Sequence, residues 1–400
     1  MPDAVIVATA RTPIGRAMKG SLVDCRPDDL TALVLRAVME KVPQLHDSEV
    51  EDVMVGCGQP AGEAGYNVAR VAALLAGLDV PGATVNRYCS SSLQTIRMAA
   101  HAIKSGEGRA FISAGVETVS RFGQGASDVG SHNVAFATAE ARTTDRSAKV
   151  GAPWEPADGL PDIYIAMGQT AENVAEAENV SRQDMDEFAC RSQQLAVASQ
   201  ENGFFEREIV PVETPDGKLV TRDDGPRPGT TVEGLAALKP VFREGGTITA
   251  GNACPLNDGA AAVVVMSSTR ANELGIRPLA RIISSGLSAL NPEIMGLGPI
   301  GASRQALERA GMTIDDVDLV EINEAFAAQV LPSARHLGIP IDKLNVKGGS
   351  IALGHPFGMT GARIMTTLLN ALEDEDKTIG LETMCVGGGQ GMAMIVERLS

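Results

Sequence analysis

The feature that most constrains the fold of this chain is an approximate internal repeat. Residues 33–55, LVLRAVMEKVPQLHDSEVEDVMV, read as a helix, a polar turn and a Val-rich strand, and residues 301–322, GASRQALERAGMTIDDVDLVEI, repeat that order. Further along each half, a polar loop rich in Gly or Ser opens an apolar helix, at 86–105 and again at 345–370. The repeat predicts that two similar units make up most of the molecule.

Short apolar strands close each unit. We expect the first unit to end on strands at 111–117 and 261–267, and the second on strands at 383–389 and 392–398. Strands that alternate with helices are typical of layered α/β folds. The sequence therefore predicts a duplicated α/β core.

The stretch from 121 to 245 interrupts the repeat. It is richer in Gly, Pro, Asp and Arg, as in GAPWEPADGLPD at 151–162, and it contains a helical run near 166–202. We interpret it as an inserted loop domain over one end of the first unit, because long insertions often form lids or binding loops; a surface excursion without a role is the alternative. Three parts follow: a first core half of 1–120 plus 246–270, the loop domain of 121–245, and a second core half of 271–400.

Length, charge and hydropathy exclude several classes of protein. A chain of 400 residues corresponds to two or three domain-sized units. Its 34 basic and 50 acidic side chains give a net charge of −16, which would repel a nucleic-acid backbone. No apolar run reaches the roughly 18 residues of a membrane span, and the N-terminus has no signal or transit pattern. We expect a cytoplasmic protein that binds neither nucleic acid nor membrane.

The cysteine spacing argues against disulfides and zinc. The six cysteines lie far apart, with no C-x-x-C pair and no His at zinc-finger spacing. We therefore expect neither a disulfide framework nor a metal site. The six are Cys25, Cys57, Cys89, Cys190, Cys254 and Cys385.

Cys89 is the first candidate catalytic residue. It lies in NRYCSSSLQT at 86–95, between an extended run and the start of a helix. A helix N-terminus favours a thiolate, so the position predicts a thiol pKa below the usual value of about 8.5 and a nucleophile. The alternative is a small buried cysteine followed by serines that only cap the helix.

His355 is the candidate base for this thiol. Of the five histidines, it alone lies in a glycine-rich loop, KGGSIALGHPFGMTG at 347–361, where small residues let a ligand approach the backbone. Cys89 and His355 occupy corresponding loops of the two units, so they could meet at the centre of the molecule. A thiol beside an imidazole is an arrangement typical of nucleophilic catalysis.

Two further motifs contribute candidate residues. In CVGGGQG at 385–391, Cys385 offers a second thiol, and the glycine N–H groups could bind a developing oxyanion; a tight turn is the alternative. In NEAFAAQ at 323–329, Asn323 follows a strand, where active sites of open sheets collect; an N-cap is the alternative. No glycine run has the spacing of a dinucleotide-binding site.

Together, NRYCSSS, NEAFA, GGSIALGHPFGMTG and CVGGGQG resemble the four signature blocks of the thiolase superfamily, in the family's order and spacing. RTPIGR near the N-terminus, MGQTAENVA at 167–175 and AGNACPLNDGAA at 250–261 match further blocks, so the resemblance covers essentially the whole chain. It implies two βαβαβαββ halves in five α-β-α-β-α layers, with a loop domain that binds coenzyme A.

The resemblance also implies roles for individual residues. Cys89 would be the acylated nucleophile, His355 would activate it, and Cys385 would be the acid and base on the acetyl-CoA side. Asn323 would hold a water that polarises the thioester carbonyl together with His355, and the N–H groups of Cys89 and Gly387 would form a second oxyanion hole. Substrate or CoA contacts would come from Arg227, Cys254, Met167, Phe326 and Ala166.

The implied activity is ping-pong cleavage of a 3-ketoacyl-CoA by CoA, with coenzyme A as co-substrate and no tightly bound cofactor. The ketoacyl synthase type of condensing enzyme usually lacks the second cysteine, so Cys385 favours a thiolase. By resemblance we also expect a homodimer or homotetramer, and a fatty-acid oxidation complex is a possible partner.

Departures from the common family pattern favour a degradative enzyme with a longer or bulkier acyl chain. Ala166 stands where acetoacetyl-CoA-forming members carry a histidine, and Phe357 and Met359 replace smaller residues beside His355. Cys254 and Pro255 stand where many relatives have Ser and Gly. A biosynthetic acetoacetyl-CoA thiolase and a non-catalytic acyl-CoA-binding homologue are the alternatives.

Overall fold

The computed structural model describes residues 2–148 and 154–400, so the Gly- and Pro-rich run expected from residue 151 begins outside the described residues. Its main sheet has ten strands in the order β10-β11-β12-β9-β1-β8-β5-β3-β4, with β2 paired to β8 off this path. The strands are β1 (Ala4–Arg11), β2 (Gly15–Arg16), β3 (Asp52–Gly56), β4 (Gly82–Val85), β5 (Ala110–Thr118), β8 (Asn257–Ser267), β9 (Ala280–Ala289), β10 (Leu319–Ile322), β11 (Ile379–Val386) and β12 (Gln390–Arg398).

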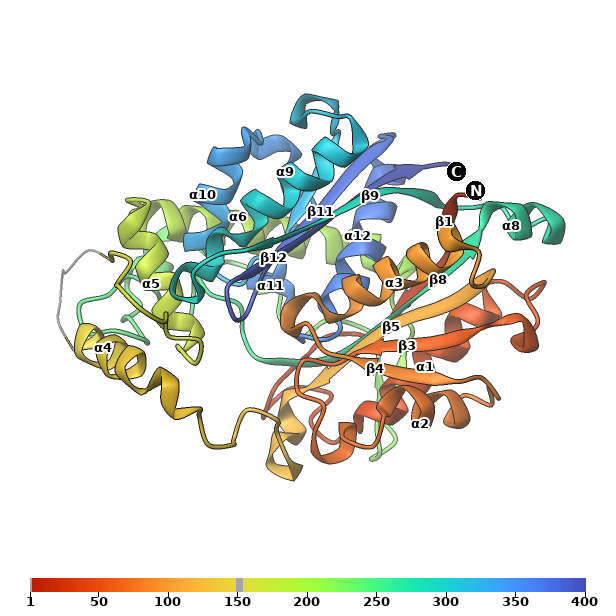
Figure 1. Ribbon diagram of the computed structural model, residues 1–400, viewed down its shortest axis with the longest axis horizontal. Coiled ribbons are helices and arrows are strands. Elements are labelled where there is room, and N and C mark those ends of the chain that lie inside the picture. The colour runs from red at the N-terminus through yellow and green to blue at the C-terminus, as the bar shows by residue number, and fades with distance from the viewer. Residues whose placement is uncertain (1, 149–153) are drawn as a thin grey trace.

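Helices form three layers around the two halves of this sheet (Figure 1). One outer layer holds α1 (Pro27–Glu40) and α2 (Val68–Leu75). The middle layer holds α3 (Ser91–Ser105) and α12 (Thr360–Asp374), and the second outer layer holds α9 (Gly298–Ala310) and α10 (Ala327–Leu337). The predicted duplicated core with five α-β-α-β-α layers is thereby confirmed.

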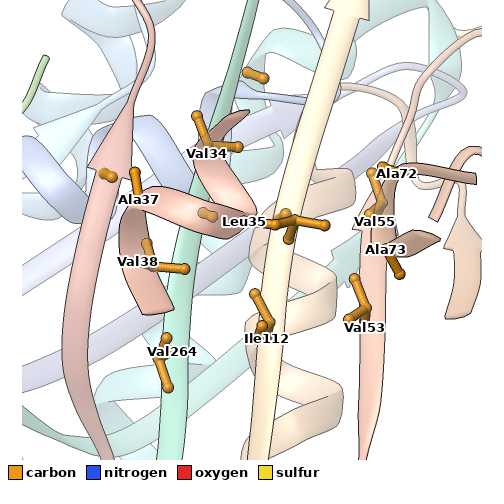
Figure 2. Close-up of a cluster of buried hydrophobic side chains, with 14 of the residues drawn as sticks. Val34, Leu35, Ala37, Val38, Val53, Val55, Ala72, Ala73, Ile112 and Val264 are labelled. Atoms are coloured by element: carbon orange, nitrogen blue, oxygen red, sulfur yellow. The ribbon is translucent and has the colours of Figure 1, made fainter. Parts of the chain in front are cut away.

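The first outer helix packs through one apolar stripe. Figure 2 shows Leu35 and Val38 of α1 directed at the sheet, near Ile112 of β5 and Val264 of β8. The stripe spacing of three and four residues is that of an amphipathic helix. Strand β8, NDGAAAVVVMS, is buried over its whole length because helices cover both of its faces.

The middle layer brings the two units together. Leu93 and Ile96 of α3 share a buried apolar cluster with Ile364 and Leu368 of α12. Because these helices begin immediately after the loops that carry Cys89 and His355, their packing fixes the two loops relative to each other.

Hydrogen bonding between the two halves of the sheet is sparse. β1 pairs with β8 along its length, from Ala4 opposite Ser267 to Arg11 opposite Ala261. With β9 of the second half it shares two residue pairs, Val5–Arg281 and Ile6–Ala280. The units are therefore held mainly by the central helices.

The second half departs from the predicted plan at one strand. The first half has β4 between α2 and α3, whereas the matching place between α10 and α12 holds a single bridge, Val320 to Leu344. Asn345 has a positive φ of 46°, and its side chain bonds the main chain of Ile322, so the segment turns away from the sheet. The repeat is complete in its helices and shortened in this strand.

The prediction that the insertion covers one end of the first half is wrong for its helices. Ala171 and Ala175 of α5, and Met185 and Phe188 of α6, join a buried cluster with Val330 of α10 in the second half. The later part returns to the first half, where Arg11 forms buried ion pairs with Glu208 at 2.7 Å and Asp223 at 2.8 Å. The remaining elements are α4 (Ala137–Ser147), α5 (Met167–Ala177), α6 (Arg182–Glu201), α7 (Val232–Ala236), α8 (Ser268–Leu274), α11 (Ser350–Leu353), β6 (Val212–Glu213) and β7 (Leu219–Val220).

Across residues 2–148 and 154–400, no helix combines the length and the apolar character that crossing a membrane requires.

Candidate active site

Cys89 lies in a short turn, Tyr88–Ser90, between β4 and α3. Tyr88 has a positive φ of 43°, a conformation that costs a non-glycine residue energy. Ser91 holds the turn, since its hydroxyl accepts from the N–H of Arg87 at 2.8 Å and donates to the carbonyl of Tyr88 at 2.7 Å. The serines therefore shape the turn that presents the cysteine.

The thiol of Cys89 does not have the low pKa that its helix position predicts. Burial raises the pKa of Cys89 to about 11, although the N–H groups of Gly387 and of Cys89 itself favour the thiolate. The negative charge of Glu117 raises the pKa further. The prediction failed because desolvation by the surrounding protein outweighs the local helix terminus.

His355 lies in the loop between α11 and α12. Its main-chain N–H donates to Asn257 Oδ1 at 2.9 Å, and its ring Nδ1 lies 2.6 Å from Thr360 Oγ1. Burial lowers the pKa of His355 to about 3, and the charge of Arg363 lowers it further. At neutral pH the site therefore holds a neutral imidazole and a neutral thiol.

Asn323 follows β10, as predicted, and its side chain is 1% exposed. Its Nδ2 lies 3.3 Å from His355 Nε2, and its Oδ1 accepts from Ser350 Oγ at 2.6 Å. The following helix α10 begins at Ala327 with Phe326 at its N-cap, so Asn323 does not cap it. The structure thus brings together His355 and Asn323 from different motifs.

Cys385 and Gly387 lie at the end of β11 and in the turn after it. Burial raises the pKa of Cys385 well above its usual value, and negative charge on Cys89 and Cys254 raises it further, which indicates that the three thiols are close. The N–H of Gly387 is directed at the sulfur of Cys89. Gly388 has a φ of 78°, which a side chain would strain.

The loops of the two halves are joined by direct hydrogen bonds. The N–H of Ala362 in α12 donates to Ser92 Oγ in α3 at 2.9 Å. Glu117 of β5 accepts from the N–H groups of Gly58 at 2.8 Å and Gly358 at 2.9 Å. Burial raises the pKa of Glu117 to about 7. This carboxyl group therefore ties a loop of the first half to the loop that carries His355.

A pocket of about 480 Å³ opens beside Cys89. Ala166, Met167 and Phe357 line it on one side, and Gly387 lines it near the thiol. The ring of Phe357 stands almost perpendicular to that of His355, with ring centres 5.2 Å apart. The pocket offers apolar room next to the nucleophile.

The other predicted contact residues lie outside the described lining of this pocket. The N–H of Cys254 donates to the carbonyl of Ala325 at 3.0 Å, next to Phe326, whose ring packs edge-on against Phe242. Arg227 is exposed, and its main-chain N–H donates to Gln193 at 2.9 Å. Cys254 nonetheless interacts with Cys89: burial raises the pKa of Cys254, and negative charge on Cys89 raises it further.

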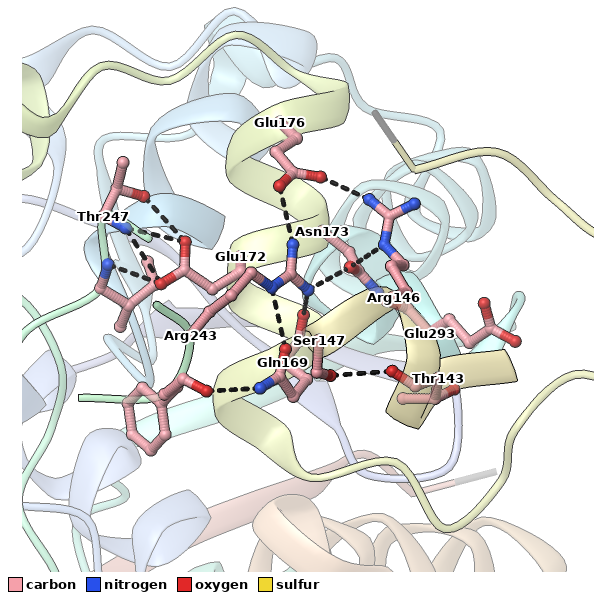
Figure 3. A network of polar contacts seen from close by, with 12 residues as sticks. Thr143, Arg146, Ser147, Gln169, Glu172, Asn173, Glu176, Arg243, Thr247 and Glu293 are labelled. Atoms are coloured by element: carbon pink, nitrogen blue, oxygen red, sulfur yellow. Dashed lines mark hydrogen bonds and ion pairs between the residues drawn. The ribbon is translucent and has the colours of Figure 1, made fainter. Parts of the chain in front are cut away.

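A polar network fixes α5, the helix that begins with Met167. Figure 3 shows Arg243 between Glu176 and Asn173, which it contacts at 2.7 Å and 2.8 Å. Glu172 accepts from the N–H groups of Thr247 and the following residue. These bonds hold the later turns of α5, whose first residue, Met167, lines the pocket.

Sequence reasoning missed Thr360, Ser350 and Glu117. Thr360 and Ser350 both lie within GGSIALGHPFGMTG. The second ring nitrogen of a buried imidazole needs a hydrogen-bond partner, and this requirement could have identified Thr360. Glu117 had no such signal, because its partners lie in two distant loops. Among residues 2–148 and 154–400, no three His, Cys, Asp or Glu side chains are grouped to hold a metal ion.

Comparisons with known proteins agree along the whole chain. The family described as "Thiolase, N-terminal domain" matches residues 4–269, and "Thiolase, C-terminal domain" matches residues 276–398. The chain is 44% identical over 409 aligned positions to a 3-ketoacyl-CoA thiolase of Aeromonas hydrophila, and 44% identical over 410 to a beta-ketoadipyl-CoA thiolase of Acinetobacter baylyi; each alignment covers 100% of both chains.

A solved structure is similar in fold. The Bacillus anthracis acetyl-CoA acetyltransferase superposes with a TM-score of 0.85 at 37% identity, covering 100% of this chain and 99% of that one. The family models cover nearly the whole chain, and the sequence motifs and the layered fold agree with them. This chain therefore belongs to the thiolase family.

Proposed function

We propose that the protein cleaves 3-ketoacyl-CoA esters with coenzyme A, releasing acetyl-CoA and a shortened acyl-CoA. Two observations support this proposal: the thiols of Cys89 and Cys385 interact electrostatically, and Asn323 contacts the His355 ring. A transferase that forms and breaks two thioesters needs one nucleophile, and it needs a separate acid and base for the leaving enolate.

The first half-reaction begins with the neutral pair. As the sulfur of Cys89 attacks the 3-keto carbon, its proton passes to His355 Nε2, which is the unprotonated ring nitrogen. The oxyanion that forms is bound by the N–H groups of Cys89 and Gly387, which in the free protein point at the sulfur. The bond between C2 and C3 then breaks, and Cys385 protonates C2 of the leaving enolate.

Asn323 and His355 stabilise the enolate. In this proposal Asn323 holds a water that, with His355, donates to the thioester oxygen of the acetyl-CoA part. Support comes from the contact of Asn323 with the His355 ring and from its near-complete burial. Coenzyme A, deprotonated by Cys385, finally attacks the acyl-Cys89 thioester to release the product.

For the acyl chain we propose a degradative preference for groups longer or bulkier than acetyl. The small side chain of Ala166 and the apolar side chains of Met167 and Phe357 support this, because all three line the pocket of about 480 Å³ that contains Cys89. The relatives named for 3-ketoacyl-CoA and beta-ketoadipyl-CoA substrates also favour it over acetoacetyl-CoA synthesis.

The coenzyme is proposed to lie on the other side of Cys89. Cys254 and Phe326 occupy facing segments next to the thiols, where they can contact the pantetheine arm. Arg227 is proposed to meet a phosphate at the nucleotide end, since its exposed guanidinium suits that anion. On this view the loop domain of 121–245 and the core halves of 1–120 plus 246–270 and 271–400 all contribute.

We further infer a cytoplasmic homodimer or homotetramer that works in fatty-acid or related acyl-CoA oxidation. Light scattering of the protein from its own host measures the assembly. A mass well above that of two or four chains would instead indicate a multienzyme complex.

Thiolysis assays test the proposed function. Purified protein is given CoA and a panel of 3-ketoacyl-CoA esters from acetoacetyl-CoA to long and branched chains, with Cys89→Ala as control. We expect turnover that favours the longer or branched esters and is lost in the variant. A preference for acetoacetyl-CoA would assign the enzyme to the biosynthetic class. The absence of turnover with every ester would instead indicate a non-catalytic acyl-CoA-binding homologue.

A further inference from the structure

A buried chain of hydrogen bonds leads from Arg363 in α12 to the ring of His355. Arg363 Nη2 lies 3.0 Å from Ser350 Oγ, and Ser350 Oγ lies 2.6 Å from Asn323 Oδ1. Asn323 Nδ2 lies 3.3 Å from His355 Nε2. Each of the four residues is at most 2% exposed, so the bonds are shielded from solvent.

The chemistry of the first member gives this chain a direction. A guanidinium group can only donate hydrogen bonds, so Ser350 Oγ must accept from Arg363. The hydroxyl proton of Ser350 is then the one that Asn323 Oδ1 accepts. This orients the amide with its oxygen towards Ser350 and its N–H towards His355, whose Nε2 must carry a lone pair.

The far side of the imidazole leads to the same result independently. Thr360 Oγ1 lies 2.9 Å from the carbonyl oxygen of Pro356, which can only accept, and 2.6 Å from His355 Nδ1. The single hydroxyl proton goes to Pro356, so His355 Nδ1 carries the hydrogen that Thr360 accepts. Both ends of the network therefore specify the Nδ1–H tautomer.

Two buried carboxyl groups lie near Arg363, at the start of the chain. Glu321 of β10 and Glu382 of β11 lie opposite each other in register, and both act electrostatically on Arg363. Among the described residues, no hydrogen-bond partner is found for either carboxylate oxygen of Glu382 or for Arg363 Nη1. Burial raises the pKa of Glu321 and of Glu382, although the charge of Arg363 lowers both. The guanidinium thus lies near two buried carboxyl groups while its Nη2 stays bonded to Ser350.

We propose that Ser350 and Arg363 are positioning residues that fix the orientation of the Asn323 amide for the carbon–carbon cleavage step. This inference rests on the proposed function. Without the Ser350 hydroxyl, the amide has no donor to hold its oxygen and is free to turn. Thr360 still holds the imidazole, so the base that activates Cys89 is retained.

Two reactions of the same enzyme separate this role from a structural one. Thiolysis of a 3-ketoacyl-CoA releases an enolate and needs Asn323. Exchange of a saturated acyl group between its CoA ester and isotopically labelled CoA needs Cys89, His355 and the hole at Gly387, but it forms no enolate. A misplaced Asn323 amide therefore slows the first reaction selectively.

The test compares Ser350→Ala with Ser192→Ala in both assays. Ser192 is a matched control, because it is also buried and its hydroxyl contacts the residues next to Ser350 and Asn323 along the chain, the Gly349 N–H at 3.1 Å and Glu324 at 2.6 Å, whereas Ser350 bonds the Asn323 amide itself. We expect Ser350→Ala to lower thiolysis by about 10- to 100-fold and to keep exchange within about threefold of wild type. Ser192→Ala should change both rates by the same factor.

Equal losses in both reactions for Ser350→Ala, or no loss in either, would overturn the inference. If the wild-type protein performed neither reaction, the proposed function would fail instead, so the two failures are distinguishable. A second measurement needs no variant: ¹⁵N NMR of histidine-labelled wild-type protein, which has five histidines, reports the His355 tautomer. An Nδ1–H ring supports the directed chain, and an Nε2–H ring refutes it.

Discussion

His355 and Thr360 are in direct contact, with Nδ1 of the imidazole 2.6 Å from the hydroxyl oxygen. Thr360 gives its own proton to the carbonyl of Pro356, one helical turn earlier. The neutral imidazole of His355 is thereby held in a single tautomer by Thr360, the first residue of α12. Five positions separate the two residues in sequence, so the motif carries its own orienting group.

Replacing Thr360 with valine tests this relationship. The change keeps the shape of the side chain but leaves the buried Nδ1–H without an acceptor, which is expected to cost about 1–3 kcal/mol of unfolding free energy. Because the ring can then adopt the other tautomer, kcat is expected to fall about 10- to 100-fold. Thr366→Val is the control, since Thr366 bonds the carbonyl of Ala362 in the same helix. Equal kcat values for the two variants would contradict the assignment.

The raised pKa of Cys89, about 11, predicts how the free enzyme reacts with alkylating agents. The thiolate is the reactive form, so the rate of alkylation by iodoacetamide should rise about tenfold per pH unit between pH 7 and pH 9. Peptide mapping identifies the modified cysteine, and Cys89→Ala provides the blank. A rate that stays flat from pH 6 to pH 8 would show instead a preformed thiolate–imidazolium pair.

The lowered pKa of His355 predicts a loss of stability in mild acid. The folded protein keeps the ring neutral down to about pH 3, whereas the unfolded chain protonates it below about 6.5. The unfolded state therefore binds the extra proton in this window, and stability falls as the pH falls, by roughly 1.4 kcal/mol per unit. Denaturant unfolding between pH 6 and pH 4.5 measures this slope. The unfolding free energy of the wild type should fall more steeply, by this amount per pH unit, than that of His355→Asn. Parallel curves would refute it.

Ala166 is expected to set the length of the acyl group. A histidine at this position would fill part of the pocket beside Cys89. We expect Ala166→His to lower kcat/KM for long-chain 3-ketoacyl-CoA esters at least tenfold, with acetoacetyl-CoA changed less than about threefold. Ala166→Ser is the small-residue control. If both substrates lose activity equally in Ala166→His, this side chain does not select chain length.

Glu117 is expected to hold the catalytic loops in register. In the wild type, Oε2 of Glu117 accepts from the N–H groups of Gly58 and Gly358, and Oε1 accepts from the N–H of Gln59. Glutamine has the same shape, but its N–H₂ must face one of these two sets of donors. Glu117→Gln should therefore lower both the melting temperature and kcat, the latter by about tenfold or more. Glu63→Gln, which removes an acidic partner of Arg121, serves as a comparison. An unchanged kcat in Glu117→Gln would exclude this role.

The sequence was most informative where motif and repeat coincide. The repeat places Cys89 and His355 in matching loops of the two units, and the helices that follow these loops, α3 and α12, do contact each other. The strand after α10 was less predictable, because the side chain of Asn345 bonds the main chain of Ile322 and leaves a single bridge where a strand was expected.

Burial explains the two main errors. The helix N-terminus before α3 is a local signal that lowers a thiol pKa, but residues distant in sequence enclose Cys89 and reverse the sign. The apolar faces of α5 and α6 gave no indication of which half they cover, because either half offers an apolar surface. The pKa of a thiol and the half that a helix covers both depend on which distant segments pack together. The spacing of residues along the sequence does not specify that packing.

The position of β1 in the sheet has a consequence for biosynthesis. Strand β1, Ala4–Arg11, lies between β8 and β9, which are made only from residue 257 and from residue 280 onwards. At about 5–20 residues per second, roughly 15 to 55 s separate β1 from its completed surroundings. During that time an apolar strand waits unpaired on the nascent chain. Correct maturation of this enzyme therefore calls for protection of β1. A released fragment that stops short of β9 cannot contain a finished active site.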